Sequence, residues 1–311
     1  MVTKKGTDGA GYSRYSYLSE KVREATSRTK PYKHYVIEDF LSTEDLAEVL
    51  EDKRTKIKRA ADDREVIKNL EKMGYKASWL PGSTQHAEAY LNQREGKGIT
   101  DKNSTCEGIG MAFALKGQEA GEANYGVQSL VEYLRADEFW NTLLKKCRIN
   151  GKDKRKYVAY TKYLDGHELA PHTDSRHKPI TFLLNLNSPD LALPKESNTR
   201  IMELKPEYRY IAEYWKYNES SDRCWLPWSW CKTIDIHEKN NSLLIIPASN
   251  TSFHGIRLNY CHLKAQRSMI YGSAWGEEAK QYECPTWEDL RIEASCKRQI
   301  NGDTCMHTRK S

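Results

Sequence analysis

The sequence predicts a mainly β protein with flanking α-helices, and the strands are expected in the second half of the chain. Residues 151–275 form strand-like apolar segments with interruptions, and they begin after a clear turn. Residues 31–150 combine helical periodicity with long loops, and we expect them to pack on the β core. Residues 1–30 contain almost no aliphatic side chains and predict a mobile arm, while residues 276–311 form a polar tail.

The composition indicates a folded chain without a strong charge signature. With 311 residues and 38% hydrophobic content, the chain is long enough for a sizeable core. Its 49 Lys and Arg against 43 Asp and Glu give a formal charge of +6, a mild excess that disfavours a nucleic-acid partner. We expect a cytoplasmic protein, because the N-terminus has no apolar signal region and no run has the length of a membrane span. The composition does not indicate an oligomeric state.

Local signals predict the first helices. Ser42 is a good N-cap and Asp45 occupies the capping-box position, so a helix is expected from about 43 to 54. Apolar residues spaced between 127 and 144 predict one amphipathic helix or a pair. Residues 79–125 show no sustained period and predict long loops of the kind that often border a site.

The chemical signal is a His-x-Asp pair between two apolar segments. In extended backbone, residues two apart point to the same side, so His172 and Asp174 can reach one metal. Iron(II) that binds both an oxidant and a cosubstrate needs a third protein ligand and open positions opposite. His254 follows the buried-strand run at 242–247, and Arg267 lies on the next strand-like segment.

The segment from about 150 to 275 resembles the iron(II) and 2-oxoglutarate dependent oxygenases, in particular the prolyl 4-hydroxylase-like branch. The matching pieces are Tyr163-Leu-Asp-Gly166, Pro171-His172-Thr173-Asp174, the strand at 180–187, the run at 241–247 leading to His254, and Arg267. The resemblance implies a double-stranded β-helix, the jelly roll of the cupins, with the helices before residue 150 against its outer sheet. It also implies iron(II), 2-oxoglutarate and O2 as cofactors and cosubstrates, with ascorbate as a supporting reductant.

By the same resemblance, His172, Asp174 and His254 are the catalytic iron ligands, and Arg267 pairs with the distal carboxylate of 2-oxoglutarate. Tyr163 is a candidate cosubstrate contact or an ordinary core aromatic. Asn185 stands where relatives often carry a Tyr, and either donates to 2-oxoglutarate or is a satisfied polar core residue.

Other candidates lie around this set. Arg257, expected in a turn, is a rival for 2-oxoglutarate or a partner for a substrate carboxylate. His167 lacks the spacing to replace a ligand and is expected at the surface or behind the ligands. Residues 188–233 are expected to form a Trp-rich insertion, and its Trp225 and Trp228 either cover the substrate or belong to a small core of the insertion itself.

The eight cysteines are scattered and are expected to be reduced thiols. A zinc site in the tail is disfavoured because the ligands lack a tight Cys-x-x-Cys pair; the residues concerned are Cys284, Cys296, Cys305 and His307.

The expected reaction is hydroxylation of an unactivated C–H bond in a small molecule, an amino acid or sugar-like metabolite, with release of succinate and CO2. Desaturation stays open, whereas halogenation is disfavoured because the Asp174 carboxylate fills the position a halide would need. The alternatives are hydroxylation of a protein or peptide side chain such as proline, nucleic-acid dealkylation, and a catalytically silent β-helix binding module.

Overall fold

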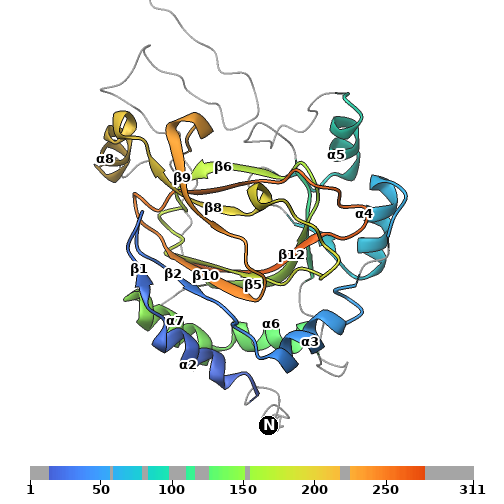
Figure 1. The fold of residues 1–311 in the computed structure, drawn as a ribbon, viewed down its shortest axis with the longest axis horizontal. Coiled ribbons are helices and arrows are strands. Elements are labelled where there is room, and N and C mark those ends of the chain that lie inside the picture. Colours follow the sequence, from blue (N-terminus) through green and yellow to red (C-terminus); the bar gives the residue numbers. More distant parts are fainter. Residues whose placement is uncertain are drawn as a thin grey trace, which may run out of the picture.

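The computed structural model describes residues 14–56, 59–78, 83–97, 110–115, 126–150, 155–217 and 225–276. These residues form two sheets in which all neighbouring strands are antiparallel (Figure 1). Across the larger sheet the order is β1 (Ser27–Arg28), β2 (His34–Ile37), β10 (Ser242–Pro247), β7 (Ile180–Asn185), β12 (Arg267–Trp275), β5 (Arg155–Tyr163), β4 (Ala112–Leu115) and β3 (Lys76–Ala77). Across the smaller sheet the order is β6 (Glu168–His172), β11 (His254–Arg257), β8 (Thr199–Leu204) and β9 (Cys231–His237).

The eight consecutive strands β5 to β12 are shared equally between the two sheets. Strands β5, β7, β10 and β12 lie together in the larger sheet, and β6, β8, β9 and β11 make up the smaller one. The chain therefore passes repeatedly between two facing four-stranded layers, which is the arrangement of a double-stranded β-helix. The predicted fold class is confirmed.

Apolar side chains from both sheets meet in the space between them. Leu183, Leu244 and Met269 from the larger sheet belong to one buried cluster with Ile201 and Ile256 from the smaller sheet. Since successive residues of a strand face opposite sides, the other face of the larger sheet needs a separate cover.

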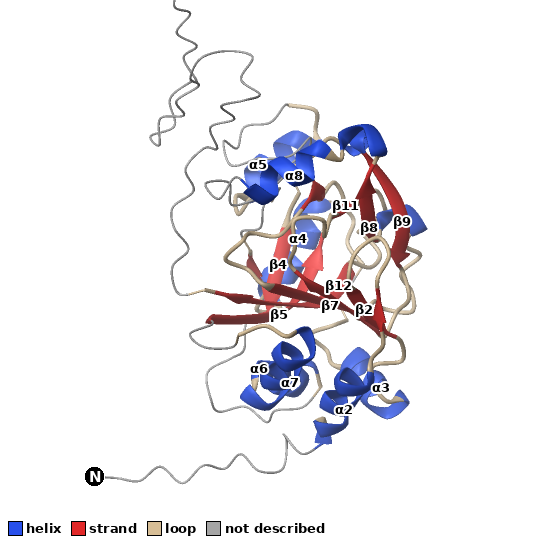
Figure 2. Cartoon of the chain, turned by 90° about the vertical axis from the view of Figure 1, so that its left-hand side faces the viewer, coloured by secondary structure: helices blue, strands red, loops and turns tan. Residues whose placement is uncertain are grey.

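Helices supply that cover (Figure 2). On this face lie α2 (Ser16–Glu24), α3 (Thr43–Glu51), α6 (Val127–Arg135) and α7 (Asp137–Cys147). The other described helices are α4 (Asp63–Lys72), α5 (Ala87–Arg94) and α8 (Tyr210–Tyr217). In the largest buried cluster, Leu130 and Trp140 of α6 and α7 join Phe182 and Ile270 of the larger sheet. The apolar residues between 127 and 144 thus form a pair of helices, one of the two predicted alternatives. In the part of the chain that the structure describes, no helix has the length and apolar character needed to span a membrane.

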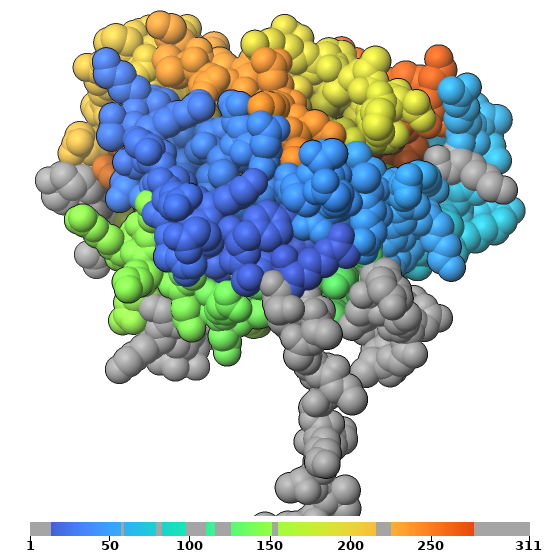
Figure 3. Space-filling model, turned by 60° about the horizontal axis from the view of Figure 1, so that its bottom comes forward, coloured from blue at the N-terminus to red at the C-terminus, as the bar shows by residue number. Residues whose placement is uncertain are grey.

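The predicted mobile arm is wrong for residues 14–30, which form α2 and β1. Tyr15, Leu18 and Val22 are completely buried, and the Tyr17 hydroxyl donates to the Asp45 carboxylate of α3. This segment spreads over the face of the molecule next to α6 and α7 (Figure 3). Burial of three well-spaced side chains offsets the entropy of ordering the segment. Residues 1–13 lie outside the described part of the chain.

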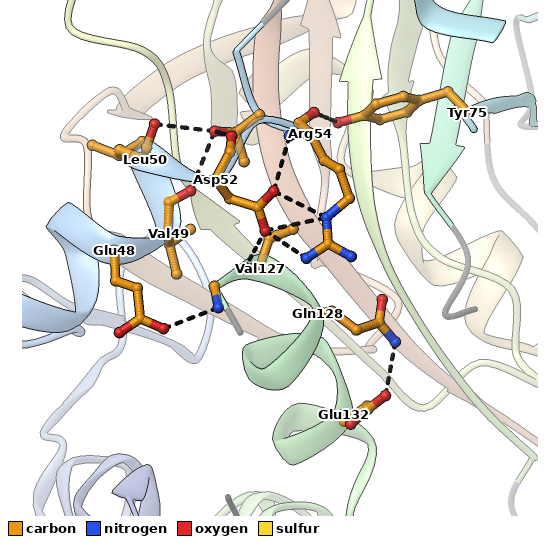
Figure 4. A network of polar contacts seen from close by, with 11 residues as sticks. Glu48, Val49, Leu50, Asp52, Arg54, Tyr75, Val127, Gln128 and Glu132 are labelled. Carbon is orange, nitrogen blue, oxygen red and sulfur yellow. Dashed lines mark hydrogen bonds and ion pairs between the residues drawn. The ribbon is translucent and has the colours of Figure 1, made fainter. Parts of the chain in front are cut away.

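Helix α3 begins as predicted and ends earlier than predicted. Ser42 is its N-cap and accepts from the Asp45 backbone N–H at 3.1 Å, while the helix ends at Glu51 instead of about residue 54. The following residue, Asp52, turns back and accepts from the backbone N–H of Val127 at 3.1 Å and from Arg54 at 2.6 Å (Figure 4). Asp52 thereby caps the first turn of α6 and ties α3 to it.

The predicted insertion at 188–233 is too long, because residues 199–204 are strand β8 of the smaller sheet. The connection that stands outside the β-helix is therefore the segment between β8 and β9. Its apolar side chains form a small cluster of their own, in which Ile211, Trp215 and Leu226 pack on Met202 and Phe253. This supports the second predicted role of the tryptophan-rich segment, a local core. The cysteine and histidine residues proposed for the tail lie outside the described residues.

Candidate active site

His172, Asp174 and His254 lie together between the two sheets. One ligand atom from each side chain can be chosen so that all three lie within 4.8 Å of one another, and all three residues are buried. His172 ends β6 and His254 begins β11, and the two stand opposite each other in the antiparallel pairing of these strands. The donor set of two imidazoles and one carboxylate is the facial set that binds non-haem iron(II).

Backbone carbonyls fix the protonation of both histidine rings. His172 Nδ1 lies 2.9 Å from the carbonyl oxygen of Ala170, and His254 Nδ1 lies 2.9 Å from that of Ser252. Because a carbonyl only accepts, each Nδ1 must carry the proton and donate it. Burial lowers the pKa of both rings, and the neighbouring His254 lowers that of His172 further. Each Nε2 is therefore an unprotonated nitrogen with a lone pair for a metal.

Asp174 is held at both oxygens. Lys178 Nζ donates to Oδ1 at 2.6 Å, and Thr181 Oγ1 donates to Oδ2 at 2.6 Å. Burial alone raises the pKa of this carboxyl. The charge and hydrogen bond of Lys178, together with the neighbouring His254 and His172, outweigh burial and hold the pKa well below its usual range. The carboxylate is ionised and oriented before any metal arrives.

The three residues open onto a cavity of about 350 Å³. Strand β12 runs along it, with Arg267 fully buried at one end and Trp275 partly exposed at the other. Beside Arg267 the described lining includes Tyr163, which pairs with it from β5, together with His167, Thr199 and Met269. Farther along β12 it includes Leu183 opposite Tyr271 and Tyr157 opposite Ser273, and Ala77, Ser78 and Gln85 also line the cavity.

Arg267 is a buried cation without a carboxylate partner among the described residues. Its guanidinium donates to Thr199 Oγ1 at 3.3 Å and to Met269 Sδ at 3.8 Å, and its Nε has no hydrogen-bond partner there. Its Cζ also lies 5.4 Å from the ring centroid of Tyr163. Since a buried charge is costly unless it is paired, this end of the cavity fits the carboxylate of an anionic ligand such as 2-oxoglutarate.

Four residues of the site were missed by the sequence reasoning or given another role: Lys178, Thr181, Thr199 and His167. His167, expected at the surface or behind the ligands, is only 2% exposed and lies in the cavity wall, with its ring 5.1 Å from that of Tyr163. Gly110 allows this position, because a Cβ there would lie 2.3 Å from the Cα of His167. The sequence shows Lys178 four residues after Asp174, but this spacing predicts an ion pair only if the turn between them brings the two side chains together.

Four predicted site residues are absent from the described cavity lining: Asn185, Arg257, Trp225 and Trp228. Asn185 shares a strand face with Thr181 and Leu183, yet its amide nitrogen donates to the backbone carbonyl of His237 at 3.0 Å. This favours the polar core alternative, although the Oδ1 of Asn185 has no partner among the described residues. Arg257 is the last residue of β11 and not part of a turn. Its guanidinium forms two hydrogen bonds with Glu168, at 2.9 and 2.7 Å, so it is already paired outside the cavity.

The two predicted tryptophan contacts differ in position. Trp225 pairs with His172 through an isolated antiparallel bridge, and its ring stacks 4.7 Å from that of His172 with an interplanar angle of 23°. Trp228 packs against the small cluster of the β8–β9 connection, and its indole N–H donates to Glu168. Trp225 therefore packs directly on a candidate metal-binding residue, whereas Trp228 lies beside Arg257.

No protein-family model matches the chain, and no curated protein matches it either. Similar solved structures include a Pseudomonas putida prolyl-4-hydroxylase, 14% identical, with 66% of this chain and 91% of that chain covered and a TM-score of 0.33. They also include HygX from Streptomyces hygroscopicus with nickel, 2-oxoglutarate and hygromycin B bound, 11% identical, covering 77% and 97%, with a TM-score of 0.30. A third is the Fe(II)/α-ketoglutarate-dependent dioxygenase TqaL, 10% identical, covering 89% and 93%, with a TM-score of 0.30.

Proposed function

We propose that this chain is an iron(II) and 2-oxoglutarate dependent dioxygenase that hydroxylates a small molecule. The observation that carries the proposal is the presence, in one cavity, of a buried His-Asp-His set and a buried arginine without a carboxylate partner among the described residues. The reaction converts R–H, 2-oxoglutarate and O2 into R–OH, succinate and CO2. One oxygen atom enters the product and the other enters succinate, so the equation balances without a further reductant.

Each residue has a distinct task in this proposal. His172, Asp174 and His254 hold iron, which supplies the binding and reduction of O2 when it is present. Arg267 and Thr199 hold the distal carboxylate of 2-oxoglutarate, and the Tyr163 ring forms the wall beside it. Lys178 and Thr181 fix the two oxygens of Asp174, so the carboxylate is held in one orientation.

The cavity supports a small substrate. Its volume of about 350 Å³ is within the range of small-molecule sites, and 2-oxoglutarate occupies part of it. Toward the open end the rings of Tyr157 and Tyr271 lie 5.8 Å apart, and they offer apolar faces for the organic part of a substrate.

Succinate formation tests the proposal. The purified protein, mixed with Fe(II), ascorbate and 2-oxoglutarate in air, should release succinate slowly even without substrate. H172A should lose both this activity and iron binding, and H86A, which changes an exposed histidine on another element, should retain both. If wild type and H172A were equally inert and neither bound iron, a silent β-helix module would be the better description.

A further inference from the structure

Lys178 is a buried cation that lines the cavity. In the proposed function it orients Asp174 and has no role in substrate binding. It lies in the connection between β6 and β7, its side chain is 8% exposed, and its Nζ donates to Asp174 at 2.6 Å. The same Nζ lies 5.1 Å from the ring centroid of Tyr271 and 5.9 Å from that of Trp275. Two aromatic rings and one carboxylate thus hold this buried ammonium in place at the wall of the cavity.

Lys178 and Arg267 lie at different stretches of the cavity face of β12. Arg267, Tyr271 and Trp275 follow one another along the cavity face of β12, and Lys178 contacts the latter two. Four residues of strand separate Arg267 from Tyr271, roughly 13 Å. The binding position for 2-oxoglutarate at Arg267 is therefore separated along β12 from the rings that Lys178 contacts.

The charges in the cavity favour an anionic substrate. The described lining contains two cations, Arg267 and Lys178, and one anion, Asp174, and its histidines are neutral. The double charge of Fe(II) and the two carboxylates of 2-oxoglutarate cancel each other. The loaded cavity thus keeps one positive charge, and it lies at Lys178, because Arg267 is paired with 2-oxoglutarate and Asp174 with the metal.

We propose that Lys178 binds a carboxylate of the substrate, whose organic part lies against the rings of Tyr157, Tyr271 and Trp275. This inference rests on the proposed function. An ammonium has three donors, so its bonds to Asp174 and to the Tyr271 hydroxyl leave one donor for an incoming carboxylate. Because Lys178 contacts a metal-binding residue directly, the C–H bond that reacts lies on a carbon close to that carboxylate. The substrate class is therefore a small organic acid.

Binding of matched acids and amides tests this inference without turnover. The full chain is loaded with Mn(II) and 2-oxoglutarate, and the probes are phenylacetate and 3-phenylpropionate with their primary amides. Paramagnetic relaxation of the probe protons reports binding near the metal, and a titration gives its Kd. The acids should bind about tenfold or more tightly than the amides, the value of one hydrogen bond to a charged group.

Variants of Lys178 complete the test. K178M should remove the preference for acids, and K178R should keep most of it. Because both changes alter the contact to Asp174 and weaken metal binding, each variant is compared at Mn(II) and 2-oxoglutarate concentrations that saturate its own site. Equal binding of acids and amides by wild type, a preserved preference in K178M, or no acid binding at millimolar concentration would overturn the inference. Tighter binding of phenyl phosphate than of the carboxylates would also contradict it. If wild type failed to bind Mn(II) and 2-oxoglutarate at all, the proposed function itself would fail.

Discussion

His254 stands directly opposite His172 in the pairing of β11 with β6, and the centroids of their rings are 4.3 Å apart. Two residues far apart in the chain thus meet because two strands of the smaller sheet share a register. A slip of one residue would turn one imidazole to the other face of the sheet, so the register of this sheet determines whether a metal site exists.

The Thr181 hydroxyl that donates to Asp174 should contribute to metal affinity. T181V keeps the shape of the side chain but removes the 2.6 Å hydrogen bond to Oδ2. We expect the affinity for Fe(II), measured anaerobically by calorimetry, to fall by about 10- to 100-fold, as is typical when a partner of a metal ligand is removed. T161V is the matched control, because Thr161 donates to the backbone carbonyl of Met269 instead. Equal losses in the two variants would contradict the assignment.

Arg267 should govern the affinity for 2-oxoglutarate and leave that for iron unchanged. R267K keeps the charge but loses the planar fork that meets a carboxylate with two hydrogen bonds. We expect the Kd of 2-oxoglutarate in the metal-loaded protein to rise about 10- to 100-fold, and T199V to raise it about two- to tenfold. Calorimetric titration under nitrogen measures both. Wild-type affinity in R267K would mean that the cosubstrate binds elsewhere.

Acidification should weaken the fold through buried neutral histidines. Burial and the charge of Arg267 lower the pKa of His167 and His237 to about 3, from an ordinary value of 6.5. As the pH falls from 6.5 toward 3, the unfolded chain takes up protons that the native protein refuses, so stability is lost with falling pH. Each histidine contributes about 1.4 kcal/mol per pH unit in that window.

Urea unfolding at several pH values checks this expectation. Between roughly pH 7.5 and pH 5 the two histidines together should lower the free energy of unfolding by about 4 kcal/mol. H237Q should lose the contribution of one histidine, about 2 kcal/mol over the same pH range, because glutamine does not titrate. An unchanged slope in H237Q would show that other groups carry the pH dependence.

Asp52 should stabilise the helical layer without affecting the site. Its carboxylate accepts from the backbone N–H of Val127 and from Arg54. Burial raises the pKa of Asp52, but these hydrogen bonds and the charge of Arg54 together lower it, so the carboxylate is ionised. D52N should lower the free energy of unfolding by about 1 to 3 kcal/mol, the range for a lost cap and a lost hydrogen bond to a charge. E51Q, at the exposed neighbouring position, is the control and should lie within about 0.5 kcal/mol of wild type.

The fold class could be predicted from the sequence because apolar runs are local signals. The His-x-Asp pair, the later His254 and Arg267 could likewise be picked out, and the structure places them in one cavity. The sequence did not reveal α2, since Tyr15, Leu18 and Val22 are spaced for a helix but surrounded by polar residues. Strand β8 was hidden within the expected insertion because a register shift between Ile201 and Met202 interrupts its alternation.

Side chains around the site were harder to predict than the ligands. Thr181 and Asn185 share one strand face, but Thr181 lines the cavity and Asn185 binds the backbone at His237. Periodicity predicts which face of a strand a side chain lies on, but not which positions along that face border a cavity. Only the packing of the two sheets decides that Thr181 borders the cavity and Asn185 does not. The role of Lys178 likewise depends on a turn that brings its ammonium back to Asp174.

Labelled oxygen tests the central claim most directly. The protein with Fe(II) and 2-oxoglutarate is exposed to isotopically labelled O2, and the succinate formed is analysed by mass spectrometry. We expect each succinate to carry one labelled oxygen atom, and we expect H172A and H254A to form none above background. Succinate without label, or equal formation by the wild type and both variants, would contradict the assignment of this cavity as an oxygenase site.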